Sequence, residues 1–305
     1  MSRHRSFSAV IPTRNRPADL RRAVASVFVQ TQLPDELIIV DQSPGPESRV
    51  AVEALFENRN DVRLVYIHDP AVTGLVAAKQ LAADRSAGAI VCFLEDDIIL
   101  EPEFIQEILR GFHNDPQMMG CCGIITNQHG QSAPYVFMHG LFFRGILRDP
   151  RAKLFVRGAA AGDAMTQCDV LWGGLSAWKR EVFESVRFDT RNGFHMLEDI
   201  EFSTRVVRHF GHCLYVNRKA RLEHHFSPAN RDAHGARQRR KLNEAIMFYK
   251  KRRTWDGASL GIGLVLVWWL AEAAAQSVRN VSIGPLRGYL LGLADGWRRE
   301  PLAAD

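Results

Sequence analysis

Short apolar runs alternate with helical patterns along the first third of the chain. Continuous runs at residues 7–11, 37–40, 62–67 and 89–94 predict buried strands. Between them, apolar residues recur every three or four positions, which predicts intervening helices, the third of them at 73–87. Strands joined by helices of this length predict right-handed βαβ units and a parallel sheet with both faces covered.

The rest of the chain is less uniform. Residues 118–178 are rich in glycine and aromatic residues, which predicts the remaining strands joined by long loops. A helical pattern returns at 198–210, and a short apolar run at 214–216 predicts another strand. Residues 235–298 differ in composition, since they open with the basic stretch 237–253, and we interpret them as a helical appendage.

The composition narrows the class of protein. Of the 305 residues, 46% are hydrophobic and 24% charged, which excludes a disordered chain and a polytopic membrane protein. Lysine and arginine exceed aspartate and glutamate by 39 − 34 = 5, an excess too small to imply nucleic-acid binding. The 5 cysteines form no CxxC pair, which predicts reduced, buried thiols in a cytoplasmic protein. The first residues lack the long apolar segment of a secretory signal.

Carboxylates follow two of the predicted strands directly. Asp41 ends one of them, and the triplet Glu95, Asp96 and Asp97 follows another. The carboxyl ends of parallel strands form the edge at which open α/β folds bind ligands. Adjacent carboxylates repel one another unless a cation neutralises them, and their hard oxygen atoms suit Mg²⁺ or Mn²⁺ bound together with phosphates. A solvated acidic helix cap before Pro102 is the alternative interpretation.

Seven short segments in a fixed order resemble the motifs of one enzyme family. They lie at 10–16, 38–43, 73–80, 93–97, 173–174, 197–201 and 222–227. Together they resemble family 2 inverting glycosyltransferases of the GT-A fold, in which 93–97 would be the Asp-x-Asp motif, 173–174 the acceptor-side glycines and 197–201 the Glu-Asp motif. No single segment is diagnostic, and the resemblance rests on their order across residues 7–231.

The resemblance implies a fold and a division of the chain. We expect an α/β, Rossmann-like nucleotide-sugar-binding fold with a mostly parallel central sheet and a C-terminal helical appendage. Residues 1–234 would form the catalytic domain, with the nucleotide-sugar half at about 1–115 and the acceptor half at about 116–234. Residues 235–305 would form a helical region that contacts a membrane surface or forms oligomers.

The resemblance also implies a nucleotide site. Pro12, Thr13 and Arg14 would line the nucleotide, and Asp41 would accept a hydrogen bond from N3–H of uracil or thymine, so the donor would be a UDP- or dTDP-sugar. An Asx turn is the alternative role of Asp41. Lys79 would face the nucleotide or the diphosphate, although the family often has arginine there.

A divalent metal, Mn²⁺ or Mg²⁺, would be the cofactor. The resemblance makes Asp97 its carboxylate ligand, places Asp96 near the ribose or the metal, and assigns His224 as the remaining protein ligand with His225 as the substitute. Glu95 stands where the family has its first aspartate, so a contact through water is an alternative to direct ligation. A polar loop without metal is the other interpretation of the histidine pair.

The reaction implied is a direct displacement at the anomeric carbon. The resemblance of 197–201 to the Glu-Asp motif makes Asp199 the base, and its place at the N-terminus of a predicted helix favours its ionised form. An ordinary acidic first turn is the alternative explanation of Asp199. The acceptor or the diphosphate would be contacted by the following residues: Glu95, Trp172, Gly173, Gly174, Glu198 and Arg231. For Trp172 core packing is an equal alternative, and Arg231 also fits a basic surface.

The C-terminal region has two interpretations. Cations at 237–253 followed by the uncharged segment 257–271 resemble a membrane-surface element that spans 237–270, with the Trp268–Trp269 pair at the interface. Residues 257–271 are too short for the roughly 20 apolar residues of a bilayer span. The alternative is a helix packed on the catalytic domain or on a second subunit, as in a homo-oligomer. No nucleic-acid recognition module accompanies the charge.

The function expected is the transfer of a hexosyl or deoxyhexosyl group from a pyrimidine nucleotide-sugar to a hydroxyl acceptor. A glycan or glycolipid of the cell envelope would be the acceptor, and the enzyme would be cytoplasmic or peripheral on the inner face of the cell membrane. The alternatives are an inactive glycosyltransferase-like scaffold and a sugar nucleotidyltransferase. The latter would need a glycine-rich triphosphate loop where the chain has Pro12, Thr13 and Arg14.

Overall fold

The computed structural model describes residues 6–57, 59–128, 130–143, 164–227, 233–256 and 261–303. Its chain forms two compact units. The first comprises Met1–His129, Ala160–Phe188 and Phe202–Ala229, and the second comprises Gly130–Ala159, Asp189–Glu201 and Asn230–Asp305. The second unit thus includes segments that precede residue 234, and the domain boundary expected there stays a prediction.

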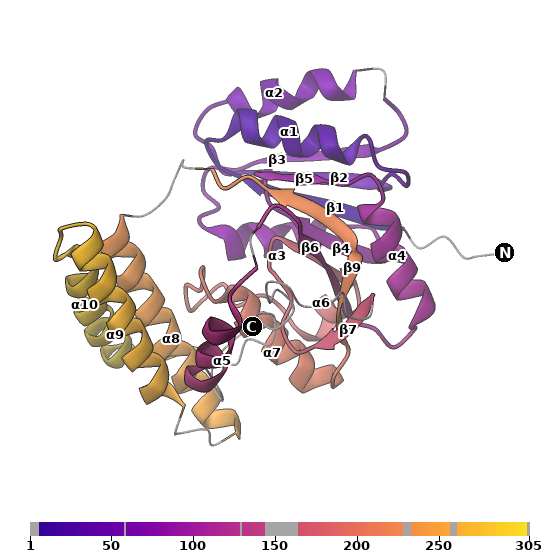
Figure 1. Cartoon of the computed structure of the whole chain (residues 1–305). Coiled ribbons are helices and arrows are strands. Elements are labelled where there is room, and N and C mark those ends of the chain that lie inside the picture. The colour runs from indigo at the N-terminus through magenta and orange to yellow at the C-terminus, as the bar shows by residue number, and fades with distance from the viewer. Residues whose placement is uncertain are drawn as a thin grey trace. The chain divides into compact units, whose positions relative to one another are not determined.

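A mixed sheet forms the centre of the first unit (Figure 1). Its strands are β1 (Phe7–Thr13), β2 (Glu36–Asp41), β3 (Arg63–His68), β4 (Ile90–Leu94), β5 (Ile98–Leu100), β6 (Gly120–Ile125), β7 (Met165–Cys168), β8 (Leu175–Lys179) and β9 (Leu214–His224). In the described residues they follow the order β3-β2-β1-β4-β8-β6-β9-β5, with β7 paired to β9. Strands β3, β2, β1 and β4 are mutually parallel, as predicted, and β8 introduces antiparallel pairing.

Helices cover both faces of the parallel strands. The helices of this unit are α1 (Pro17–Val27), α2 (Glu47–Phe56), α3 (Leu75–Arg85), α4 (Phe104–Asn114), α6 (Val182–Ser185) and most of α7 (Glu198–Phe210). Figure 1 shows α1 and α2 on one face and α3 on the other, as right-handed crossovers require. Stacked rings of Phe188 and Phe202, 4.1 Å apart, contribute to the core, and the 5 cysteines are buried and unpaired, as predicted.

Strand β9 is longer than the run at 214–216 that predicts it. Beyond Val216 its buried residues are Asn217, Ala220 and Leu222, whereas Lys219 and Arg221 are exposed. This alternation is the period of a half-buried strand, but the charged residues interrupt the apolar run. The extension matters because it carries His224 to the end of the strand. The hydrophobic pattern of the sequence also does not predict strand β5, since three residues are too few to show a period.

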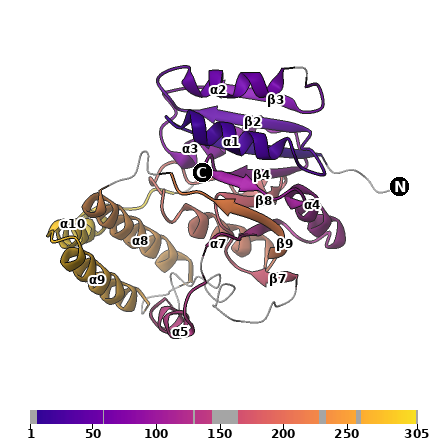
Figure 2. The same cartoon turned by 45° about the horizontal axis from the view of Figure 1, so that its top comes forward.

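The second unit contains a bundle of three helices, α8 (His234–Asp256), α9 (Ile262–Arg279) and α10 (Gly284–Arg298), together with α5 (Ala133–Phe142) (Figure 2). Helix α5 lies in the region where only strands and loops are expected. Helix α10 approaches α8 through Gly288 and Gly292, because a Cβ atom there would lie 2.0 Å from the Gly235 oxygen and 2.5 Å from the Arg239 oxygen. In the described part of the chain, none of the helices has the length and apolar character needed to cross a membrane.

Candidate functional site

The acidic triplet lies between two strands of the first unit. Strand β4 is buried over its whole length and ends at Leu94, and β5 begins at Ile98. The backbone N–H of Glu95 donates to the Gly174 carbonyl at 3.1 Å, just before β8. Pairing on both sides therefore fixes the backbone of the triplet, in contrast to the solvated helix cap that is the alternative interpretation.

Three side chains of this unit meet at one point. Nε2 of His224 lies 3.0 Å from Oε2 of Glu95 and 3.0 Å from Oδ1 of Asp97. The pairing of β5 with β9 places Ile98 opposite His224, which brings the end of β9 to the triplet. One ligand atom from each of the three residues lies within 4.8 Å of the others. Two carboxylates and an imidazole form a donor set that fits Mn²⁺ or Mg²⁺.

Charge compensation holds this cluster together. Burial opposes ionisation of Asp97, but the hydrogen bonds from His224 and from the Ser227 N–H outweigh it and keep the pKa of Asp97 below its usual value. Burial also opposes the charged form of His224, yet its bonds to Asp97 and Glu95 raise its pKa to about 9. The imidazole is therefore protonated at neutral pH and occupies the place that a cation would take.

His225 lies outside the cluster. Its ring contacts Glu223 at 2.8 Å and is exposed, and only its backbone N–H reaches the triplet, donating to the Asp97 carbonyl at 2.8 Å. The geometry favours His224 over His225 as the metal ligand.

Asp96 faces the first strand instead of the cluster. Its carboxylate accepts from Thr13 Oγ1 at 2.7 Å and from the Arg16 guanidinium at 2.9 Å, and Arg16 also lies 3.6 Å from Asp97. Burial raises the pKa of Asp96 to about 6 despite these partners. Sequence reasoning overlooked Arg16, although it belongs to the segment 10–16, and selected Arg14, whose side chain is exposed.

Asp41 is fully buried at the end of β2, opposite Thr13 of β1. Its Oδ1 accepts from the Ser43 N–H at 2.9 Å, and its Oδ2 accepts from the Tyr66 hydroxyl at 2.7 Å. The first contact is the Asx turn that the sequence offers as the alternative role. Each carboxylate oxygen has a second lone pair, so recognition of a nucleobase by Asp41 stays a prediction.

Lys79 is buried and does not present its charge to solvent, with 1% of its surface exposed. Its Nζ donates to the Gly173 carbonyl at 3.0 Å and so ties helix α3 to the segment before β8. At the neighbouring Gly174, a Cβ atom would lie 2.3 Å from Cγ and Cδ of Glu95. Glycine is needed there because the Glu95 side chain passes directly over the backbone. Trp172, which precedes the two glycines in the sequence, is half-buried.

The remaining predicted residues lie elsewhere. Glu198 and Asp199 belong to the second unit, in the first turn of α7, where Asp199 Oδ1 accepts from the Ile200 N–H at 2.8 Å. Their roles stay predictions. Arg231 lies outside the described residues.

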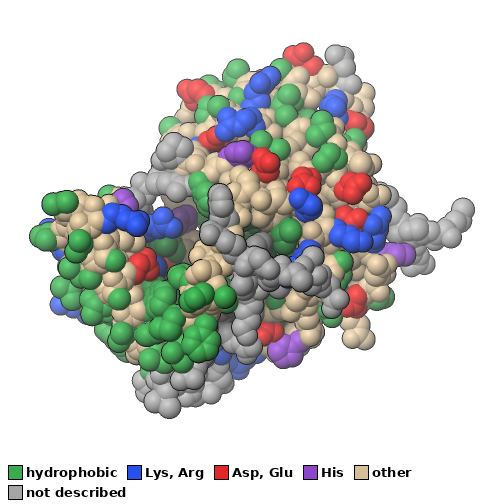
Figure 3. All heavy atoms as spheres, in the orientation of Figure 1, with side chains coloured by type: hydrophobic (Ala, Val, Ile, Leu, Met, Phe, Trp, Pro, Cys, Tyr) green, Lys and Arg blue, Asp and Glu red, His purple; other side chains and the backbone are tan. Residues whose placement is uncertain are grey.

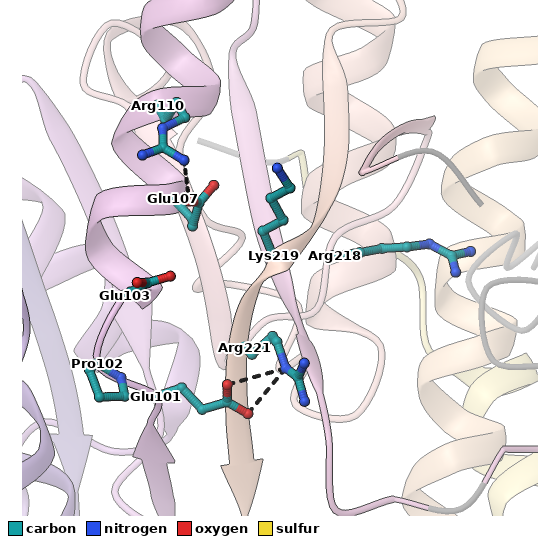
Figure 4. Close-up of a pocket in the computed structure, with 8 residues that line it drawn as sticks. All are labelled: Glu101, Pro102, Glu103, Glu107, Arg110, Arg218, Lys219 and Arg221. Carbon is teal, nitrogen blue, oxygen red and sulfur yellow. Dashed lines mark hydrogen bonds and ion pairs between the residues drawn. The ribbon is translucent and has the colours of Figure 1, made fainter. Parts of the chain in front are cut away.

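A surface hollow of about 610 Å³ in the first unit contains none of the predicted site residues (Figure 4). Two ion pairs lie within the hollow, since Glu101 pairs with Arg221 at 3.2 Å and Glu107 pairs with Arg110. It is therefore not the candidate catalytic site. Its lining consists of Glu101, Pro102, Glu103, Glu107, Arg110, Arg218, Lys219 and Arg221.

Comparison with known sequences identifies similar proteins. The model of "Glycosyl transferase family 2" matches residues 8–174. A glucosyl-dolichyl phosphate glucuronosyltransferase of Haloferax volcanii is 22% identical over 231 residues, which are 73% of this chain and 66% of that protein. A validoxylamine A glucosyltransferase of Streptomyces hygroscopicus subsp. limoneus is 27% identical over 122 residues, 38% of this chain and 26% of that protein. The chain thus spans less than two thirds of either relative.

Two solved structures share the fold. The mannosyltransferase PcManGT from Pyrobaculum calidifontis, in complex with GDP-Man and Mn²⁺, superposes with a TM-score of 0.64 at 16% identity, over 98% of this chain and 89% of that one. GalNAc-T7 with UDP, GalNAc and Mn²⁺ gives a TM-score of 0.60 at 16% identity, over 85% of this chain and 52% of that one.

Proposed function

Because the chain belongs to glycosyl transferase family 2 and has the GT-A fold, we propose that it is a metal-dependent inverting glycosyltransferase. It moves a hexosyl or deoxyhexosyl group from a UDP- or dTDP-sugar to a hydroxyl acceptor, a glycan or glycolipid of the cell envelope. The observation that carries the proposal is that His224 meets Glu95 and Asp97, which belong to a segment far from it in the sequence.

The residues divide the chemistry between them. Glu95, Asp97 and His224 would hold Mn²⁺ or Mg²⁺, which when bound neutralises negative charge on the leaving diphosphate. Asp199, in the first turn of α7, takes the proton of the acceptor hydroxyl as general base. Attack from the face opposite the diphosphate inverts the anomeric carbon.

The choice of a pyrimidine donor rests on Asp41. A carboxylate there accepts a hydrogen bond from the N3–H of uracil or thymine, and the Asx turn to Ser43 holds it at the carboxyl end of β2. Thr13 and Arg16, which bond to Asp96, keep the neighbouring strand end polar and suited to a nucleotide.

An inactive scaffold is the alternative that the glutamate at position 95 suggests. The longer side chain does not remove this carboxylate from the cluster, since it lies 3.0 Å from His224. Nothing in the cluster therefore argues for lost metal binding. A sugar nucleotidyltransferase is disfavoured by the match to family 2.

A panel of nucleotide-sugars tests the proposal. UDP- and dTDP-sugars, with GDP-sugars for comparison, are incubated with the full chain in Mn²⁺ or in EDTA, and release of the nucleoside diphosphate is measured. We expect a pyrimidine donor to release its nucleoside diphosphate in Mn²⁺ and not in EDTA. Release from GDP-sugars only would contradict the pyrimidine assignment, and intact Mn²⁺ binding without any turnover would favour the scaffold.

Membrane contact through 237–270 is the finer part of the proposal, and the contacts within the second unit bear on it. Lys241, Lys250 and Lys251 of the stretch 237–253 pair with carboxylates of their own unit, and Trp269 is buried. These pairs compensate only part of the charge of the stretch, so membrane contact through 237–270 stays a prediction.

The turn between α9 and α10 has the character of a lipid-binding tip. Val278, Val281 and Ile283 are 80%, 94% and 77% exposed, and Figure 3 shows hydrophobic side chains gathered on this unit. The exposed residues Arg279 and Arg287 flank them. Apolar side chains beside arginines suit the headgroup boundary of an anionic bilayer, so we propose this tip as a further point of contact with the inner face of the cell membrane. A second copy of the chain is the alternative occupant.

A further inference from the structure

Helix α8 holds the start of α7 at two points within the second unit. The carboxylate of Glu244 accepts through Oε2 from the N–H groups of Met196 and Leu197, at 2.7 and 2.9 Å. The Leu197 carbonyl accepts the first helical hydrogen bond, from the Glu201 N–H at 2.9 Å. Glu244, from another helix, thus caps the N-terminus of α7. The residue before α7, Leu197, has an apolar side chain that cannot provide this cap.

The second point lies one turn further along α7. Nζ of Lys251 donates to Oε1 of Glu201 at 2.6 Å and also contacts Asp189. All three groups are buried, with 5%, 1% and 2% of their surfaces exposed. Glu244 and Lys251 are seven residues apart on α8 and share one face of it, because seven residues make about two turns.

Asp199 stands midway between these two anchors. Leu197 precedes it by two residues and Glu201 follows it by two, so both ends of the segment that carries it are bound to α8. A buried carboxylate such as Glu244, only 4% exposed, carries a desolvation cost, and its Oε1 has no hydrogen-bond partner in the described residues. A helix cap alone does not require a buried carboxyl group, since serine or asparagine at the cap position provides one with less desolvation.

We propose that Glu244 is a positioning residue that aims Asp199, with Lys251 holding α7 one turn further along. This inference rests on the proposed role of Asp199 as base. Glu244 fixes the two peptide groups before the helix, which sets the direction of its first turn and with it the direction of the Asp199 side chain. General-base catalysis depends steeply on such placement, because small displacements of a catalytic group cost large factors in rate.

The test measures kcat and the KM for the donor in Glu244→Ala and Glu244→Gln, prepared in the full chain. We expect Glu244→Ala to lower kcat by roughly 10- to 100-fold with an unchanged donor KM. Glu244→Gln should restore most of the rate, because its amide oxygen can accept both N–H bonds. Glu272→Ala, which removes the partner of Lys241 in the same unit, is the control and should retain kcat. If Glu244→Ala does not fold, Glu244→Asp replaces it, since its shorter side chain also loses both bonds.

The same substitution is then made in an Asp199→Ala background. A positioning role predicts that Glu244→Ala leaves the residual rate of this background unchanged, because the group it aims is gone. If Glu244→Ala lowers kcat by the same factor in both backgrounds, or leaves kcat at the wild-type value, the proposal is overturned in favour of a purely structural contact. Wild-type turnover in Asp199→Ala alone would refute both the base and its positioning, while leaving metal-dependent transfer intact.

Discussion

At the scale of single residues, the protonated state of His224 is the property most open to measurement. Its pKa of about 9 arises because the hydrogen bonds to Asp97 and Glu95 outweigh burial. A metal ion needs a neutral imidazole, so metal and proton compete for the same site. Below pH 9 each bound ion must displace a proton, and the apparent metal affinity rises with pH up to that value.

Proton release on Mn²⁺ binding tests this competition. We expect about one proton released per ion at pH 7, measured by calorimetry in buffers of different ionisation enthalpy. His224→Ala should lose this release, whereas His225→Ala, which alters only the exposed neighbour, should keep it. Release that is the same in both variants would show that His224 is not the group that the metal displaces.

The sequence predicted some of these residues and not others for a physical reason. Asp97 and His224 follow apolar runs or motifs, so a local pattern selects them. The bonds of Asp96 to Thr13 and Arg16, and the buried position of Lys79, depend on strands that are distant in the sequence. Local patterns contain no information on such contacts. The same is true of Glu244, which looks like any other acid of a charged helix.

At the scale of elements, the pairing of β4 with β8 determines how the side chains of Glu95, Asp97 and His224 are packed. It places Gly174 against the Glu95 side chain, where no Cβ atom fits without moving that side chain. The parallel half of the sheet was predictable from alternating strands and helices. Helix α5 and the full length of β9 were not predictable, because charged or aromatic residues interrupt the hydrophobic periodicity of these elements.

Gly174→Ala should weaken the metal site and spare the fold. The added methyl group would push Glu95 away from His224, and a flexible glutamate can rotate at a cost of about 1 kcal/mol. We expect Mn²⁺ affinity to fall about tenfold, the equivalent of 1.4 kcal/mol, with little change in the melting temperature. Gly263→Ala is the control, because a Cβ atom there meets nothing within 4 Å. Unchanged Mn²⁺ affinity in Gly174→Ala would mean that Glu95 is not a ligand.

At the scale of the whole molecule, charge and apolar surface are distributed differently from what composition suggests. The basic stretch 237–253 contributes Lys241, Lys250 and Lys251 to internal ion pairs, so part of its charge is compensated. Exposed apolar side chains of the second unit lie at Val267 and Leu270 in α9 and at Val281 and Ile283 in the turn after it. A linear sequence shows how many cations a segment has but not which of them are paired.

Flotation with anionic vesicles tests the lipid-binding tip. We expect the wild-type chain to float and the variant Val281→Ser with Ile283→Ser to partition at least about tenfold less, because burial of each side chain contributes roughly 1.5–3 kcal/mol. Val50→Ser, at a 65% exposed position of α2, is the control. Equal partitioning of all three proteins would exclude the tip, and a shift in sedimentation of the double variant from dimer to monomer would assign it to a second copy.

The most direct measurement is the change in melting temperature on adding UDP with and without Mn²⁺. The wild-type chain should be stabilised mainly when both are present, by about 3 kcal/mol at a hundredfold excess over Kd. Asp97→Asn should lose this metal-dependent part. Asp169→Asn, in a second Asp–His pair of the first unit at 2.7 Å from His212, should retain it. Stabilisation by UDP that is equal in Mn²⁺ and in EDTA, or that persists in Asp97→Asn, would contradict a metal-held diphosphate at this cluster.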